Sequence, residues 1–150
     1  PKSAEAHDQL AMAYLNLSEY GSVKTECERA LAIDPEHSAA LGRLGHLLAA
    51  CPDAKYRDGP KARELALKAC KVTDDNDTQL LAVLAAAQAE CGDFKEAIRV
   101  QKKALSLLDG GATDEKEDYE KRLELYKKGQ PYRDELEDDP MDAKGGNRGK

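Results

Sequence analysis

The stretch GDFKEAIRVQKKAL, residues 92–105, reads as an amphipathic helix, and similar stretches occur twice more in the chain. They are SEYGSVKTECERAL at 18–31 and RDGPKARELALKAC at 57–70. Each carries an acid at its second position, a small or β-branched residue at its sixth and an alanine at its thirteenth. A self-similar period of this length is typical of a solenoid built from stacked repeats.

A second helical pattern precedes each copy, at 4–17, 38–51 and 78–91. In each, four residues fall at i, i+3, i+4 and i+7, which is one face of an α-helix. These faces are His7, Leu10, Ala11 and Tyr14, then Leu41, Leu44, Gly45 and Leu48, then Leu81, Leu84, Ala85 and Gln88. The repeated unit is therefore predicted to be helix, short turn, helix.

Small residues recur at matched places in these units. Ala11, Gly45 and Ala85 are expected where the two helices of a pair lie closest, because a short side chain lets two backbones approach. Helix propensity alone would explain an alanine at one such site, but not a small residue at the same phase three times.

The repeated unit resembles the tetratricopeptide repeat (TPR), over residues 3–111. The matching residues are Leu10, Ala11, Tyr14, Tyr20, Val23, Ala30 and Pro35, then Leu44, Gly45, Leu48, Ala62 and Ala69, then Leu84, Ala85, Phe94, Ala97 and Ala104. The resemblance implies an all-α, right-handed superhelical solenoid of three hairpins, at about 4–37, 38–77 and 78–111. The sequence departs from the family pattern because Gln88 stands in the Tyr position and no Trp is present.

A finer resemblance concerns the second half of the chain. The insertion CPDAKYRD, residues 51–58, and the later stretch RLELYKKGQPYRDE, residues 122–135, are similar to TPR arrays of large bacterial proteins. Some of those carry a Ser/Thr kinase domain. The alternative to an independent binding module is therefore a regulatory segment of a larger enzyme. Because the chain begins at Pro1 rather than Met, we expect it to be a piece of a longer protein.

The end of the array is expected to need a cover, since the last repeat of a solenoid exposes an apolar face. Residues 113–129 are predicted to form a capping helix with Thr113 as its N-cap. Tyr119, Leu123 and Tyr126 share one face of it and are expected to pack on the preceding helix. The alternative is a free helix that binds a partner. Residues 130–150 are expected to form a polar, partly disordered tail, in which Tyr132 could anchor the start of the segment onto the cap helix.

Catalysis finds no support in the sequence. The histidines have no nucleophile at a recognisable spacing, and no glycine-rich phosphate loop occurs. The segment DDNDTQ, residues 74–79, fails as a calcium loop because Gln79 and Ala85 stand where Gly and Glu are needed. The cysteines, Cys27, Cys51, Cys70 and Cys91, lack metal-binding spacing. We therefore expect no enzyme activity, no cofactor and no metal site.

Composition narrows the class of partner. The net charge is −6, and no basic stripe is present that would bind nucleic acid. No apolar run reaches the length of a membrane span. Unpaired cysteines in apolar stripes favour a reducing, cytoplasmic location, although pairing in an exported protein stays open. We expect a protein or peptide partner and a monomer, with self-association through the first repeat as the alternative.

The concave side of such an array is formed by the first helix of each pair. Opposite the core stripes these helices are expected to present a groove whose candidate ligand-binding residues are Asp8, Gln9, Met12, Arg43, His46, Val83 and Ala86. Arg43 and His46 are the leading candidates, because they are cationic or titratable groups among small neighbours. An unused solvated face is the alternative.

Overall fold

The computed structural model describes residues 3–108, 110 and 113–135. Its helices are α1 (Ala4–Asn16), α2 (Tyr20–Ile33), α3 (Ser38–Ala50), α4 (Gly59–Val72), α5 (Thr78–Glu90), α6 (Phe94–Leu107) and α7 (Asp114–Lys127). A short 3-10 helix, Ala54–Tyr56, interrupts the α3–α4 connection. No strand occurs among the residues that the structure describes.

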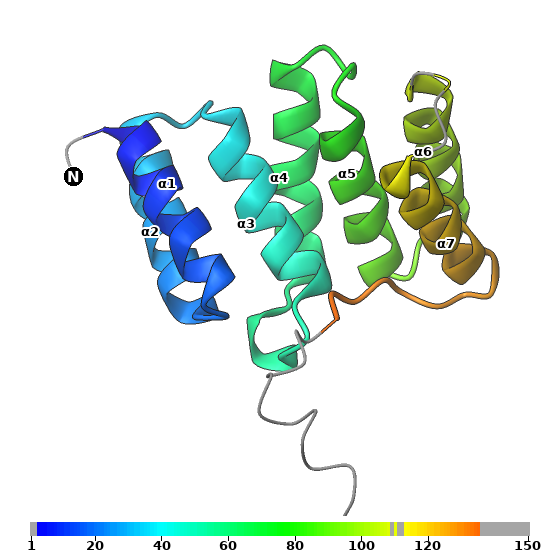
Figure 1. Cartoon of the computed structure of the whole chain (residues 1–150), viewed down its shortest axis with the longest axis horizontal. Helices are drawn as coiled ribbons and strands as arrows, with labels where there is room; N and C mark the ends of the chain where they lie inside the picture. The colour runs from blue at the N-terminus through cyan, green and yellow to red at the C-terminus, as the bar shows by residue number, and fades with distance from the viewer. Residues whose placement is uncertain (1–2, 109, 111–112, 136–150) are drawn as a thin grey trace, which may run out of the picture.

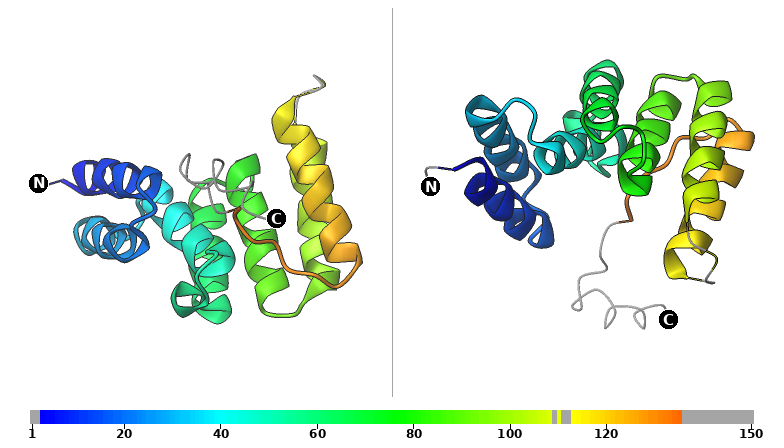
Figure 2. Two further views of the ribbon diagram at one scale, coloured as in Figure 1. Left: turned by 60° about the horizontal axis from the view of Figure 1, so that its bottom comes forward. Right: turned by 90° about the horizontal axis from the view of Figure 1, so that it is seen from above.

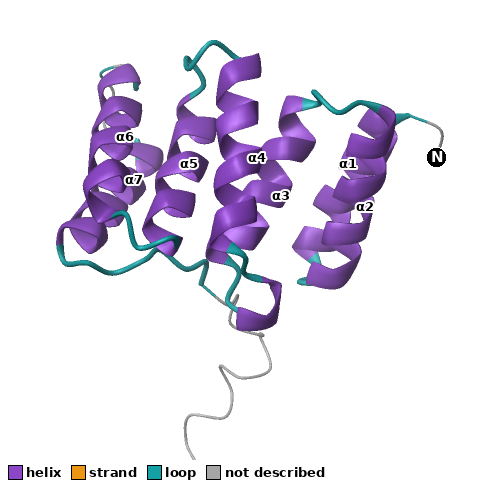
Figure 3. Ribbon diagram, turned by 180° about the vertical axis from the view of Figure 1, so that it is seen from behind, coloured by secondary structure: helices purple, strands orange, loops and turns teal. Residues whose placement is uncertain are grey.

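The helices form antiparallel pairs that stand in a row (Figure 1). The pairs are α1 with α2, α3 with α4, and α5 with α6, and the second helix of each pair packs on the first helix of the next. Figure 2 shows the row from two further directions, and Figure 3 shows it from behind. The all-α solenoid predicted from the repeats is confirmed.

Side-chain caps set where α4 and α6, the second helices of two of the pairs, begin. Asp58 accepts a hydrogen bond from the Lys61 backbone N–H at 3.1 Å, and Asp93 accepts one from the Glu96 N–H at 3.2 Å. Each aspartate is therefore an N-cap rather than the second residue of a helix, because its oxygen satisfies a backbone donor of the first turn. The helices consequently start two residues later than the repeated stretches.

Close contact between helices depends on the small residues. Ala30, Ala69 and Ala104 are fully buried. A Cβ placed on Gly45 of α3 would lie 3.5 Å from the Ala62 carbonyl oxygen of α4. A methyl group at this position would be in van der Waals contact with the α4 backbone, which shows how closely the two helices approach here.

The helix α7 covers the end of the row. Tyr119, Leu123 and Tyr126 are buried, and the side chain of Gln101 in α6 donates a hydrogen bond to the Tyr119 carbonyl at 3.1 Å. Because α7 packs on α6 as α3 packs on α2, it stands in the position of the first helix of a further pair. Within the part of the chain that the structure describes, no helix is both long and apolar enough to cross a bilayer.

Candidate functional site

A groove of about 720 Å³ opens on the side of the molecule formed by α3, α5 and α7. Its lining residues are Leu15, Tyr20, Ser38, Ala39, Gly42, Arg43, His46, Leu47, Asp77, Gln79, Leu80, Ala82, Val83, Glu115, Asp118, Tyr119, Arg122 and Asp134. The floor is apolar and the rim is charged. α7 therefore does more than cover α6, because it also supplies one wall of the groove.

Two glycines of α3 shape the floor. A Cβ on Gly42 would lie 2.4 Å from Cδ2 of Leu80, and one on Gly45 would lie 3.3 Å from Cγ1 of Val83. Leu80 and Val83 of α5 therefore rest directly on the α3 backbone. Their side chains are consequently almost buried, and the groove is shallow at this point.

Arg43 is held by a buried acid. Its Nε and Nη2 donate hydrogen bonds of 2.9 Å and 3.0 Å to the two carboxylate oxygens of Asp8, which is 2% exposed. This hydrogen bonding raises the pKa of the Arg43 guanidinium above its ordinary value. We expected Asp8 to be presented to a ligand, and this expectation is corrected because α3 covers it and Arg43 occupies both of its oxygens.

The α7 wall carries an ion pair and a stacked guanidinium. Arg122 pairs with Asp118 one turn earlier, at 2.7 Å. The guanidinium of Arg122 also lies 4.0 Å from the ring centre of Tyr132 and 5.5 Å from that of Tyr119. Contact between a cation and the face of an aromatic ring is favourable, so Arg122 joins α7 to the chain that follows it.

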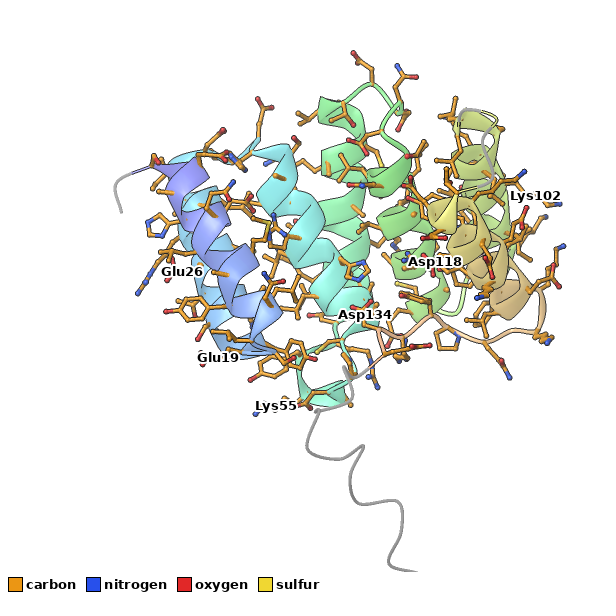
Figure 4. The ribbon with its side chains drawn as sticks, viewed as in Figure 1. Glu19, Glu26, Lys55, Lys102, Asp118 and Asp134 are labelled. Atoms are coloured by element: carbon orange, nitrogen blue, oxygen red, sulfur yellow. The ribbon has the colours of Figure 1, made fainter. Side chains whose placement is uncertain are left out.

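That following chain, residues 131–135, is here called the strap. In Figure 1 the strap, coloured orange, runs back from α7 along the lower edge of the row to the end of α3. Figure 4 labels Asp134 beside that end of α3 and Asp118 on α7. The Nε2 atom of His46 lies 2.8 Å from a carboxylate oxygen of Asp134. Tyr132 was expected to reach the cap helix, and it contacts α7 through Arg122.

The charge state of Asp134 reflects these contacts. Burial by itself raises the pKa of the carboxyl, but His46, the Tyr132 hydroxyl and the Arg122 charge together outweigh burial and leave the pKa below its ordinary value. The carboxylate is therefore ionised near neutral pH, and it accepts hydrogen bonds from both His46 and the Tyr132 hydroxyl.

The same tripeptide, Tyr-Arg-Asp, occurs at 56–58 and at 132–134, and both copies contact the C-terminal end of α3. The last carbonyls of a helix have no partner within the helix. Here the backbone N–H groups of Asp58 and Asp134 donate to the Leu48 and Ala50 carbonyls, each at 2.8 Å. The side chains of Arg57 and Arg133 donate to the carbonyls of Cys51 and Ala49 respectively.

Both arginines also reach one acid at the end of α5. Arg57 lies 3.6 Å from a carboxylate oxygen of Glu90, and Arg133 forms an ion pair with the other oxygen. Glu90 therefore connects the α3–α4 loop to the strap.

The structure brings together only some of the candidate residues. Arg43, His46 and Val83 line the groove, whereas Gln9 and Met12 are exposed on α1 and do not. Ala86 was expected at the surface and is 1% exposed, because α5 lies between neighbours in the row. The sequence reasoning did not identify Asp118, Arg122 and Asp134, although the repeated Tyr-Arg-Asp was a sign of the strap.

Other polar chemistry is sparse. Among the residues that the structure describes, no group of three or more His, Cys, Asp or Glu side chains is placed to hold a metal ion. The four cysteines are free thiols. Burial raises the pKa of Cys27 to about 12 and that of Cys70 to about 11, so neither is a thiolate near neutral pH.

Comparison with known proteins establishes the fold. No protein-family model and no curated protein matches the sequence. Among solved structures, the crystal structure of the Sgt2 TPR domain from Aspergillus fumigatus is similar, with a TM-score of 0.64 and 20% sequence identity. The match covers 97% of this chain and 95% of that chain. The chain therefore has the fold of a TPR domain.

Proposed function

We propose that the chain is a non-catalytic protein-interaction module, which holds a peptide or a partner helix in the groove between α3, α5 and α7. The observation that carries this proposal is the groove itself. Its volume of about 720 Å³ lies within the range of ligand-binding pockets, and its lining combines apolar residues with many charged groups at the rim.

The groove lining suggests how a partner would be held. Leu15, Tyr20 and Ala39 are the apolar lining residues that keep exposed surface for a side chain of the partner, and the charged rim fixes its orientation. Arg43 contributes hydrogen-bond donors that Asp8 keeps in one position, so they are already ordered before a partner arrives. We expect micromolar affinity, which corresponds to about 8 kcal/mol of binding free energy.

Selection from a random peptide library on the full chain, followed by calorimetry with a synthesised peptide, tests this function. Ala39 is exposed and lines the groove, so Ala39→Trp should obstruct it and weaken binding at least tenfold. Ala32 of α2 is also exposed but lies outside the groove, which makes Ala32→Trp a matched control with unchanged affinity. Equal affinities for the two variants would contradict the proposal.

A further inference from the structure

The strap borders one end of the groove, where Asp134 is a lining residue, and three adjacent side chains of different chemistry hold it in place. The ring of Tyr132 stacks on Arg122, and the carboxylate of Asp134 pairs with His46. Between them, Arg133 points to Glu90 and to the Ala49 carbonyl. Each of the three strap residues therefore contacts a group of complementary chemistry: the aromatic ring a guanidinium, the arginine a carboxylate, and the aspartate an imidazole.

The groups that hold the strap all belong to the walls of the groove or to the helix ends beside it. Arg122 comes from α7, His46 from α3 and Glu90 from the end of α5. One main-chain hydrogen bond, from the Asp134 N–H to the Ala50 carbonyl, fixes the direction of the strap at this point. A peptide supplied by another molecule would find the same set of donors and acceptors.

The strap is held by contacts that can break without unfolding of the helices. Side chains in its ion pairs keep substantial exposure: 25% for His46, 33% for Asp134 and 31% for Arg133. Ion pairs in contact with water contribute little to stability, so the strap can leave while the helices stay packed. Gly129, with a φ of +68°, stands between α7 and the strap and allows the chain to change direction there.

The second copy of Tyr-Arg-Asp indicates that the end of α3, together with Glu90, accepts an Arg-Asp segment from more than one part of the chain. In the α3–α4 loop, the aspartate N–H again donates to a terminal α3 carbonyl and the arginine again contacts both a carbonyl and Glu90. The two copies enter from different parts of the chain. The shared contacts are those of the arginine side chain and of the aspartate N–H. The other side chains differ, because Tyr56 packs on Tyr20 and Asp58 caps α4.

We propose that the strap site, formed by Arg122, His46, Glu90 and the C-terminal carbonyls of α3, binds an extended partner segment with an aromatic, a basic and an acidic residue in that order. The strap occupies this site until the partner displaces it. The inference rests on the proposed function and adds the chemistry of the partner and a competitor within the chain. Because a tethered segment has a high effective concentration, the strap keeps weaker ligands out.

A labelled peptide in trans tests the proposal. The probe is the synthetic peptide KGQPYRDELE, which has the sequence of residues 128–137, and its control is KGQPARAELE. Binding to the unaltered full chain is compared with binding to the full-length double variant Tyr132→Ala, Asp134→Ala. The probe should bind the double variant at least tenfold more tightly than the unaltered chain, and the control peptide should bind neither. Adding His46→Ala to the double variant should weaken binding of the probe.

Circular dichroism and thermal melting establish that the double variant is folded. If it is not, the milder Asp134→Asn variant takes its place, with the same expected order of affinities. Failure of the probe to bind a folded variant, or equal binding of probe and control, would overturn the proposal. A dimer of the unaltered chain that disappears in the double variant would assign the site to a second copy of this chain, and would also overturn it.

This outcome is separable from that of the proposed function. Peptides selected on the full chain and sensitive to Ala39→Trp report on the part of the groove around Ala39, whereas the strap is held by His46, Arg122 and Glu90. If those peptides bind and the strap peptide does not, only the strap proposal fails.

Discussion

Arg43 of α3 donates two hydrogen bonds, of 2.9 Å and 3.0 Å, to the carboxylate of Asp8 in α1. These bonds connect the first helix pair to the second. The contact joins residues 35 positions apart. Since Asp8 is almost completely removed from water, its charge depends on Arg43 for compensation. Arg43 is therefore both a part of the groove lining and a structural link between repeats.

Removal of this link has a predictable cost. Arg43→Ala leaves a buried carboxylate without a partner and should lower the free energy of unfolding by about 3–5 kcal/mol. The double variant Asp8→Leu, Arg43→Leu removes both charges and should recover most of that loss. Urea unfolding measures both variants. An Arg43→Ala variant as stable as the unaltered chain would show that the pair does not hold the repeats together.

A large-to-small substitution in the buried face of α7 tests whether that face stabilises the fold. Leu123 is 9% exposed, so Leu123→Ala should leave a void and lower the free energy of unfolding by about 2–5 kcal/mol. Leu107 of α6 is 41% exposed, and Leu107→Ala is the control, with an expected change within about 0.5 kcal/mol. If both variants melt at the temperature of the unaltered chain, α7 does not depend on its apolar face.

The cysteines should differ in their reactivity. Only Cys91 is partly exposed, whereas Cys27 is fully buried and its pKa is raised to about 12 by burial. At pH 8 the reactive thiolate of Cys27 is therefore almost absent. Iodoacetamide should modify Cys91 first in the folded protein, with all four reacting in denaturant, as mass spectrometry of digested samples would show. Equal rates at Cys27 and Cys91 in the folded state would contradict the packing of α2.

Attachment of the strap should weaken in acid. The pKa of Asp134 lies below its ordinary value of 3.8 in the folded chain, so the contribution of the carboxylate to attachment is fully present above pH 3.8 and is lost as the pH falls through the lowered pKa. The groups that face the carboxylate are His46, Tyr132 and Arg122. The Asp134 amide resonance should move toward its unfolded position below pH 3.8.

The variant Asp134→Asn controls the acid experiment, because its side chain cannot titrate. Its amide resonance at position 134 should not show the same transition. A resonance of the unaltered chain that stays constant from pH 7 down to the pH at which the helices themselves unfold would contradict the role given to the carboxylate.

The helices could be predicted from the sequence because their causes are local. The apolar faces recur at helical spacing, and the caps Asp58, Asp93 and Thr113 lie directly before their helices. Small residues at matched positions indicated the stacking of the pairs. These features depend on neighbours within one or two turns, which a sequence displays directly.

The details of the groove could not be predicted in the same way. Burial of Asp8 and Ala86 depends on the rotation and spacing of packed helices, which no short pattern specifies. His46 and Asp134 are 88 residues apart, and Asp134 lies in a segment without the helical periodicity that would have predicted its position. The repeated Tyr-Arg-Asp was visible in the sequence, but only the structure shows that both copies meet at α3 and Glu90.

The claim that the groove holds a partner is tested most directly by mapping a selected peptide onto the isotope-labelled full chain by NMR. We predict that the perturbed amide resonances belong to the groove-lining stretches of α3, α5 and α7, with Ala39, Gly42 and Ala82 among them. Perturbations confined to exposed residues of α2, α4 and α6 would contradict the account, because they would place the partner on the opposite side of the row.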